Sequence, residues 1–216
     1  MQTNDKSIWN EIYEKEKFTP GWVYPGTDRN LLRLIGNYLK KNKNVLPSLL
    51  DIGCGNGRNS NIVESLPEHK IKYTGADFAE KVLEYCRSTY TGKKEFVYAD
   101  MTAPSLPLEK SYQMIIDSGC FHAIEPAKRK SYIDNLYKLS QPDSLIILAF
   151  WYRTEKTPDT DTPAYFPYLY LDEWFFNCKD IETIFSDQFT VEDFFVDKDL
   201  YPGINNGFAY AVLEKN

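Results

Sequence analysis

The sequence predicts one α/β domain, built on a doubly wound, Rossmann-like sheet of seven strands. The sheet is expected to be mostly parallel and to end in an antiparallel hairpin. Two observations carry this prediction. Short apolar runs alternate with amphipathic stretches between residues 47 and 152, and the runs end in the acids Asp51, Asp77, Asp100 and Asp117. A glycine-rich turn follows the first run directly. Because parallel strands end at one edge of a sheet, we expect these acids to gather there, where such folds bind ligands.

The first 46 residues are expected to form a helical arm ahead of the sheet. Apolar residues, among them Trp9 and Tyr13, repeat at spacings of three and four in a predicted helix over 5–17. An aromatic segment over 18–26 holds two Pro-Gly pairs that end this helix. A second helix is expected after Asp28, a favourable N-cap residue. We expect the arm to fold over the site and to tighten when the ligand binds.

The turn after the first strand reads Asp51-Ile52-Gly53-Cys54-Gly55-Asn56-Gly57-Arg58-Asn59. Gly53 and Gly57 can adopt backbone angles that other residues avoid, and Gly55 allows a ligand to approach the main chain. Free N–H groups at the following helix start favour an anionic group. A dinucleotide fingerprint has its third glycine one place later, where this chain has Arg58. A nicotinamide oxidoreductase is therefore disfavoured.

The other elements follow in chain order. Strands are expected near 47–52, 71–76, 95–99, 112–116 and 144–152, with helices near 57–66, 79–90 and 126–140. Residues 153–167 are rich in proline and small polar residues, which predicts an irregular loop long enough to serve as a lid. A short helix near 178–185 precedes antiparallel strands near 189–196 and 207–214. We divide the domain into the arm (1–46), the cofactor-binding core (47–152), a lid or substrate loop (153–175) and the C-terminal helix and hairpin (176–216).

Composition limits the classes of partner. The formal net charge is −6, whereas nucleic-acid binders usually carry a basic face, so nucleic acid is disfavoured as a substrate. The four cysteines and two histidines lack metal-ligand spacing, and no metal site is expected. The first residues lack the apolar core of a signal peptide, and no run is apolar enough to span a bilayer. We expect a reduced, cytoplasmic protein that binds no membrane. The oligomeric state stays open.

With an acid two residues ahead of three alternating glycines, the turn resembles the first motif of the class I S-adenosylmethionine-dependent methyltransferases. The resemblance extends from about 48 to 214. Within that class the chain is most similar to the small-molecule methyltransferases of the thiopurine, thiol, halide and tellurite-resistance type. That similarity rests on Trp9-x-x-x-Tyr13 with its following Pro-Gly-Trp segment, and on Asp117-Ser118-Gly119-Cys120-Phe121-His122-Ala123-Ile124. It implies S-adenosylmethionine as cofactor, with S-adenosylhomocysteine as its product.

The residues expected to bind the cofactor lie in the arm, the glycine turn and the strand ends: Trp9, Tyr13, Asp51, Gly53, Cys54, Gly55, Gly57, Asn59, Asp77, Phe78, Asp100, Met101, Asp117 and Ser118. Asp77 is expected to accept both ribose hydroxyls. The resemblance implies that Asp100 meets the adenine amino group, that Met101 packs on the ring, and that Asp117 lies near the methionine end. Residues placed like Trp9 and Tyr13 are more often core residues of an amphipathic helix, and their role in covering the cofactor rests only on the resemblance.

The expected substrate pocket comprises Trp22, Cys120, His122, Trp151 and Tyr152. Ordinary core packing is an equally good explanation of these aromatic residues. For Cys120, a small buried packing residue is the favoured interpretation over a soft contact to the substrate. Methyl transfer from a sulfonium is an in-line displacement that chiefly requires alignment and exclusion of water. A base is needed only for an acceptor that arrives protonated, and His122 is the candidate.

The segment Asp117-Ser118-Gly119-Cys120 stands where the resembled amino-group methyltransferases carry an Asn-Pro-Pro-Tyr-type motif. This absence favours a small-molecule acceptor with a thiol or another soft atom. An O- or N-methyltransferase of a metabolite or natural product is the alternative, and methylation of a protein stays open. A module that binds S-adenosylmethionine without turnover is the second alternative.

Overall fold

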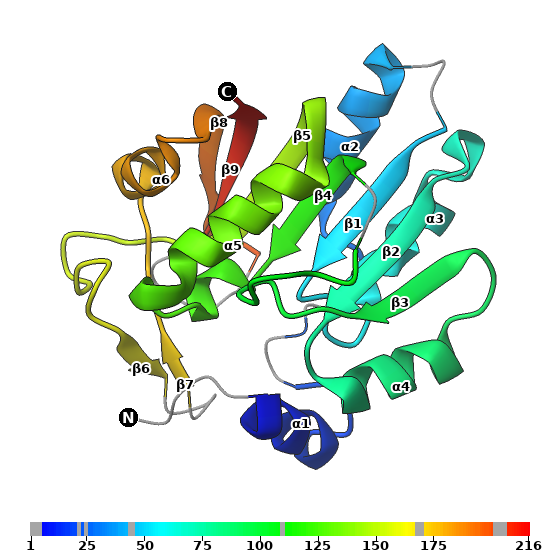
Figure 1. Ribbon diagram of the computed structural model, residues 1–216, viewed down its shortest axis with the longest axis horizontal. Coiled ribbons are helices and arrows are strands. Elements are labelled where there is room, and N and C mark those ends of the chain that lie inside the picture. The colour runs from blue at the N-terminus through cyan, green and yellow to red at the C-terminus, as the bar shows by residue number, and fades with distance from the viewer. Residues whose placement is uncertain are drawn as a thin grey trace.

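The computed structural model describes residues 6–20, 23, 26–42, 46–108, 111–166, 171–200 and 207–216. Its main sheet has seven strands in the order β3-β2-β1-β4-β5-β9-β8, with helices on both faces (Figure 1). The strands are β1 (Ser48–Ile52), β2 (Lys72–Asp77), β3 (Lys94–Tyr98), β4 (Tyr112–Ser118), β5 (Ser140–Trp151), β8 (Phe189–Asp197) and β9 (Phe208–Lys215). Strands β1 to β5 pair in parallel, and β9 is antiparallel to both β5 and β8. The predicted sheet and its closing hairpin are confirmed.

The helices are α1 (Lys6–Lys15), α2 (Arg29–Lys41), α3 (Ile62–Ser65), α4 (Glu80–Thr89), α5 (Pro126–Leu139) and α6 (Cys178–Phe185). Alternate residues of β5 explain how they cover the sheet. Ile146, Leu148 and Phe150 pack with α5 and α6, and Ile147, Ala149 and Trp151 pack with α2 and α4. A strand covered on both faces therefore reads as one apolar run.

Two predicted elements differ from the structure. The helix expected over 57–66 is a 3₁₀ turn, η1 (Arg58–Asn61), followed by the short α3. Asn59 and Ser60 are buried there, and polar residues of this kind favour local bonds over regular helix. Strand β5 begins at Ser140 rather than near 144, because a register shift between Tyr112 and Met114 lets its first residues join β4.

The segment predicted as an irregular loop, 153–167, contains a short strand. Strand β6 (Ala164–Phe166) pairs antiparallel with β7 (Leu171–Glu173) in a separate two-stranded sheet. The predicted turn signals at 202–206 lie outside the described residues. No helix in the described ranges is long and apolar enough to cross a membrane.

The first helix of the arm, α1, and the residues directly after it pack on α4. The main-chain N–H of Lys81 donates to the side-chain oxygen of Asn10 at 3.0 Å, and the Lys81 ammonium lies 3.2 Å from Glu14. The ring of Phe18 stacks on Tyr85 with centroids 4.6 Å apart. These contacts place α1 below the carboxyl edge of the parallel strands (Figure 1).

Candidate active site

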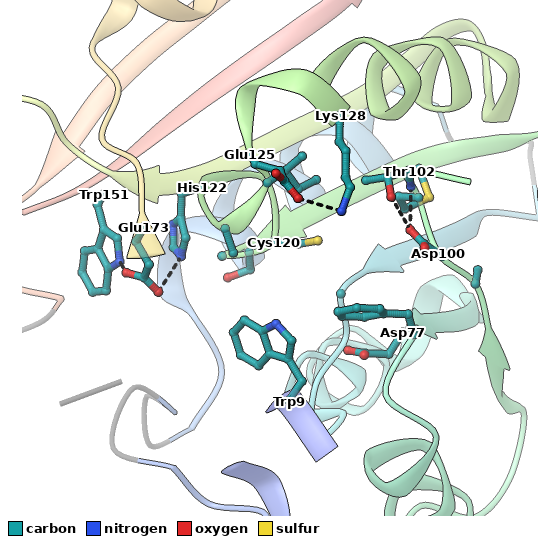
Figure 2. Close-up of a pocket in the computed structure, with 18 of the residues that line it drawn as sticks. Trp9, Asp77, Asp100, Thr102, Cys120, His122, Glu125, Lys128, Trp151 and Glu173 are labelled. Atoms are coloured by element: carbon teal, nitrogen blue, oxygen red, sulfur yellow. Dashed lines mark hydrogen bonds and ion pairs between the residues drawn. The ribbon is translucent and has the colours of Figure 1, made fainter. Parts of the chain in front are cut away.

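A cavity lies between the carboxyl edge of the parallel strands and α1. Figure 2 shows Asp77 and Asp100 on one side of it and His122, Trp151 and Glu173 on the other, with Trp9 and Cys120 between them. Its lining comes from α1, the strand ends, the short 3₁₀ helix η3 (Phe121–Ala123), the start of α5, β7 and β9. Chain segments that are distant in sequence thus build one cavity with two chemically different ends.

The predicted cofactor residues divide into two groups. Those that line the cavity are Trp9, Tyr13, Gly53, Asp77, Phe78, Asp100, Met101 and Ser118. Those that lie behind its wall are Asp51, Cys54, Gly55, Gly57, Asn59 and Asp117. The space that the sequence leaves open above Gly55 is occupied by the arm: a Cβ on Gly55 would lie 2.5 Å from the Tyr13 hydroxyl.

Asp77 is fixed at the end of β2 by backbone donors. One carboxylate oxygen accepts from the N–H of Gly55 and the other from the N–H of Ala79, both at 2.9 Å. Burial raises the pKa of this carboxyl above its usual value. Each oxygen keeps further acceptor capacity for a hydroxyl in the cavity.

The nearby end of β3 supplies Asp100 and the apolar Met101. Asp100 accepts from the N–H and the hydroxyl of Thr102 at 2.8 and 2.7 Å. With Phe78 and Ala99, Met101 forms an apolar wall beside these carboxylates. This end of the cavity combines flat apolar surface with hydrogen-bond acceptors.

Asp51 supports the glycine turn from below. Its carboxylate accepts from the Tyr73 hydroxyl at 2.6 Å and the Asn59 amide at 3.2 Å. Burial raises the pKa of Asp51 to about 7, against the lowering effect of these hydrogen bonds. The side chain therefore contacts protein and not the cavity.

Asp117 has the same kind of place beneath η3. Its carboxylate accepts from the Tyr132 hydroxyl at 2.6 Å and from the N–H groups of Cys120 and Phe121 at 2.8 and 3.0 Å. Burial raises its pKa to about 6. It fixes the turn that carries Ser118 and Cys120 to the cavity.

Of the predicted substrate-pocket residues, Cys120, His122 and Trp151 line the cavity. Tyr152 lies outside the lining, where its ring contacts Phe194 with centroids 6.2 Å apart. Trp22 lies outside the described residues. Burial raises the pKa of the half-buried Cys120 thiol well above its usual value, which keeps the thiol protonated.

Glu173 is a buried polar residue at this end of the cavity that the sequence did not reveal. Its carboxylate accepts from the indole N–H of Trp151 at 2.5 Å, and its other oxygen lies 3.6 Å from Nε2 of His122. The His122 ring stacks on Trp151 at 5.6 Å and 16°, and meets the edge of Phe208 at 6.2 Å. The backbone carbonyl of His122 accepts from the N–H of Trp174 at 2.8 Å, which joins η3 to the end of β7.

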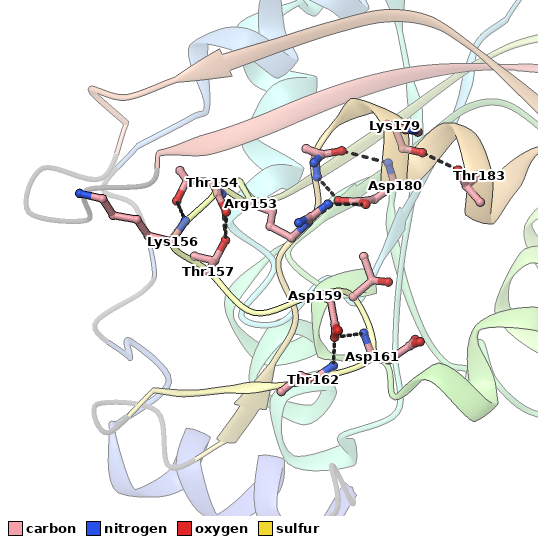
Figure 3. Close-up of polar contacts among 12 residues, drawn as sticks. Arg153, Thr154, Lys156, Thr157, Asp159, Asp161, Thr162, Lys179, Asp180 and Thr183 are labelled. Carbon is pink, nitrogen blue, oxygen red and sulfur yellow. Dashed lines mark hydrogen bonds and ion pairs between the residues drawn. The ribbon is translucent and has the colours of Figure 1, made fainter.

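The loop that precedes β6 is held to the core by ion pairs and turns. The Arg153 guanidinium donates to both oxygens of Asp180 at 2.6 and 2.7 Å, and Thr154 and Asp159 each close a local turn (Figure 3). Asp180 also forms a capping box with Asn177 at the start of α6. This segment leads through β6 to β7, which delivers Glu173.

Arg58 is a second residue that sequence reasoning did not assign. It lines the cavity directly after the glycine turn. Its Nη1 is buried and has no hydrogen-bond partner among the described residues. Other lining residues missed from sequence are Ala99, Thr102, Gly119, Ala123, Ile124, Glu125, Lys128 and Phe208. The feature of the sequence that pointed to Arg58 was its position directly after the glycine turn.

Comparison with known proteins identifies the class. A family described as a methyltransferase domain matches residues 49–143. A TehB-like S-adenosylmethionine-dependent methyltransferase from Corynebacterium glutamicum superposes with a TM-score of 0.62 at 16% identity, covering 98% of each chain. The 1,6-didemethyltoxoflavin-N1-methyltransferase of Burkholderia thailandensis superposes with a TM-score of 0.70 at 15% identity, covering 98% of this chain and 87% of that one. Residues 49–143 therefore match a methyltransferase domain, and the two solved structures show that the chain has the fold of S-adenosylmethionine-dependent methyltransferases.

A curated relative matches only a part of the chain. The tRNA N(3)-methylcytidine methyltransferase trm140 of Schizosaccharomyces pombe is 30% identical over 119 residues, which are 51% of this chain and 38% of that protein. The chain thus spans well under half the length of that relative.

Proposed function

We propose that this protein transfers a methyl group from S-adenosylmethionine to a small molecule held at the His122 end of the cavity. The observation that carries the proposal is the two-ended cavity under α1. One end has acceptors and apolar surface suited to a nucleoside, and the other has aromatic walls and a buried polar group. A cavity that encloses donor and acceptor together aligns them and excludes water, as a displacement at a methyl carbon requires.

The lining residues fit S-adenosylmethionine. Asp77, held by backbone N–H groups, suits the ribose hydroxyls, and Phe78 with Met101 suits the adenine ring. The unpartnered Nη1 of Arg58 suits the carboxylate of the methionine part. When bound, the cofactor supplies a methyl group on a positively charged sulfur.

Two chemical classes compete for the atom that accepts the methyl group: a soft atom such as sulfur, or a nitrogen or oxygen. The missing Asn-Pro-Pro-Tyr-type motif favours a thiol or another soft atom, and half-buried Cys120 is compatible with such an acceptor. A buried carboxyl beside His122 instead favours an O- or N-nucleophile. One relative in the comparisons is named for its action on tRNA, whereas the net charge of −6 opposes a nucleic-acid substrate here.

The test is release of S-adenosylhomocysteine by the purified protein against a mixed panel. The panel holds aliphatic and aromatic thiols, iodide, selenite, catechols, small amines, planar nitrogen heterocycles and unmodified tRNA. Turnover of any small molecule supports the proposal. Turnover of tRNA alone would contradict it, and tight binding of S-adenosylmethionine with no turnover on any acceptor would favour the binding module.

A further inference from the structure

Glu173 is an acid in an unusual place. Its side chain is 3% exposed and that of His122 is 6% exposed, so both groups are removed from bulk water. Burying a carboxyl is costly unless it is paired or changes its protonation state. In the described part of the chain no lysine or arginine forms an ion pair with Glu173, and its only charge-capable neighbour at short range is His122.

Among the described residues, only one of the two carboxylate oxygens of Glu173 accepts a hydrogen bond. Trp151 donates its indole N–H to one oxygen of Glu173 at 2.5 Å. The second oxygen is 3.6 Å from Nε2 of His122, beyond hydrogen-bond length. Nδ1 of His122 is buried without a hydrogen-bond partner among the residues described. The pair thus keeps unused hydrogen-bonding capacity in the wall of the cavity.

Among the described residues, the other charged groups that line the cavity form no ion pair with Glu173 or His122. Asp77 and Asp100 lie at the other end of the cavity (Figure 2), and Arg58 lines it directly after the glycine turn. At the start of α5, Lys128 is neutralised by Glu125 at 2.7 Å.

Arg129 of α5 faces the residue next to Glu173. It lies over the ring of Trp174 at 5.6 Å and donates to the carbonyls of Ile124 and Thr160. With no cation bound to the carboxyl, burial raises the pKa of Glu173 to about 8 and lowers the pKa of His122 to about 3. The pair then carries one exchangeable proton on the carboxyl at neutral pH.

We propose that Glu173, with His122 beside it, receives a proton from the methyl acceptor. The acceptors of this cavity are then small molecules that arrive with an N–H or O–H group. This inference rests on the proposed function and narrows its substrate class to N- or O-nucleophiles.

The step balances in atoms and charge. The nitrogen or oxygen of the acceptor forms a bond to the methyl carbon, while the carbon–sulfur bond breaks and its electron pair stays on sulfur. The acceptor's N–H or O–H bond breaks, and its proton passes to the pair and ends on Glu173. The negative carboxylate and the positive sulfonium charge are lost together, which is favourable in a buried site. Iodide has no proton to give, and a thiol can ionise in water before it binds, so neither acceptor needs a base in the cavity. A second anion beside an ionised Glu173 is also disfavoured.

Binding of the cofactor should by itself change the protonation of Glu173, whether or not an acceptor is present. A positive sulfur in the cavity favours the ionised form of Glu173, so the carboxyl should release its proton when S-adenosylmethionine binds. S-adenosylhomocysteine has the same carboxylate and amino group but an uncharged sulfur, so it should release less. The difference between the two ligands isolates the effect of the sulfonium charge.

The experiment is calorimetric titration of the protein with each ligand near pH 7, in buffers of different ionisation enthalpy. We expect the wild-type protein to release roughly half a proton more with S-adenosylmethionine than with S-adenosylhomocysteine. Glu173→Gln keeps an acceptor for the Trp151 indole and should abolish the difference. Glu125→Gln removes another carboxyl of the same cavity, and the difference should persist in that variant.

Each outcome decides the inference. Equal proton release with the two ligands in the wild-type protein would overturn it, and this comparison needs no variant to fold. A difference that survives in Glu173→Gln would assign the proton to another group and would also overturn it. Turnover restricted to thiols or iodide would contradict the substrate class. Absence of any binding heat with either ligand would instead refute the proposed function.

Discussion

At the scale of single residues, the acids at the strand ends separate into two kinds. Asp77 and Asp100 line the cavity, whereas Asp51 and Asp117 accept hydrogen bonds from tyrosine hydroxyls inside the protein. The difference follows from their neighbours: Asp77 is bound by backbone N–H groups at the cavity, and the other two are covered by Tyr73 and Tyr132. The same residue type at the same edge therefore either faces the ligand or supports the wall.

Arg58 gives a prediction at this scale. Replacing it by Gln should weaken S-adenosylmethionine binding about 10- to 100-fold, because a charge-assisted bond to a carboxylate contributes roughly 1.5–3 kcal/mol. Decarboxylated S-adenosylmethionine lacks the carboxylate and should bind wild type and variant about equally. Calorimetry or fluorescence titration measures both affinities. Equal weakening of the two ligands would show that Arg58 acts on the fold and not on the carboxylate.

At the scale of elements, the glycine turn packs directly against Cys120 at the start of η3. Gly53 has φ +62, and a Cβ there would lie 2.5 Å from Cβ of Cys120. Cys120 is held in turn by its N–H bond to Asp117. The turn and η3 therefore occupy their places as one unit, and the cavity wall between them depends on the missing side chain.

A pair of substitutions tests this contact. Gly92 also has a positive φ, +95, but nothing lies within 4 Å of a Cβ built there. Gly92→Ala should lower the free energy of unfolding by about 1–2 kcal/mol, the cost of the left-handed conformation alone. Gly53→Ala should cost about 2–4 kcal/mol, because the clash with Cys120 adds to that strain. Urea denaturation measures both values, and equal losses would count against the contact.

The elements also show what sequence can and cannot predict. Hydrophobic period, glycine spacing and turn residues were sufficient for the sheet, for its antiparallel close and for Asp77 at the cavity. Trp9 at the cavity was expected only from the resemblance to the class I methyltransferases. Glu173 was missed because no local pattern distinguishes a buried acid in β7 from a surface acid. Its role arises only when β7 pairs with β6 and meets η3 through the bond between Trp174 and His122. Phe208 reaches the cavity from β9 in the same way, by sheet topology.

At the scale of the whole molecule, the cavity is closed from two directions. The sheet edge forms its floor, and α1 covers it with Trp9 and Tyr13. The loop before β6 is anchored by Arg153 and by the bond from Arg129 to the carbonyl of Thr160. The described part of this loop is thus tied to α5 and α6. Helix α1 is the part of the arm that covers the cavity, and it is joined to the core mainly through α4.

The arm therefore carries the last prediction, that it tightens when cofactor binds. Trp9 and Tyr13 belong to the cavity lining, so a ligand there adds contacts that α1 lacks without it. Saturating S-adenosylhomocysteine should slow chymotryptic cleavage within residues 18–26 by roughly tenfold, since local opening must then break those contacts as well. Mass spectrometry of timed digests identifies the cleavage sites. Trp9→Ala removes one such contact and should show less protection at saturating ligand. Equal cleavage rates with and without ligand would show that the arm is ordered independently of the cofactor.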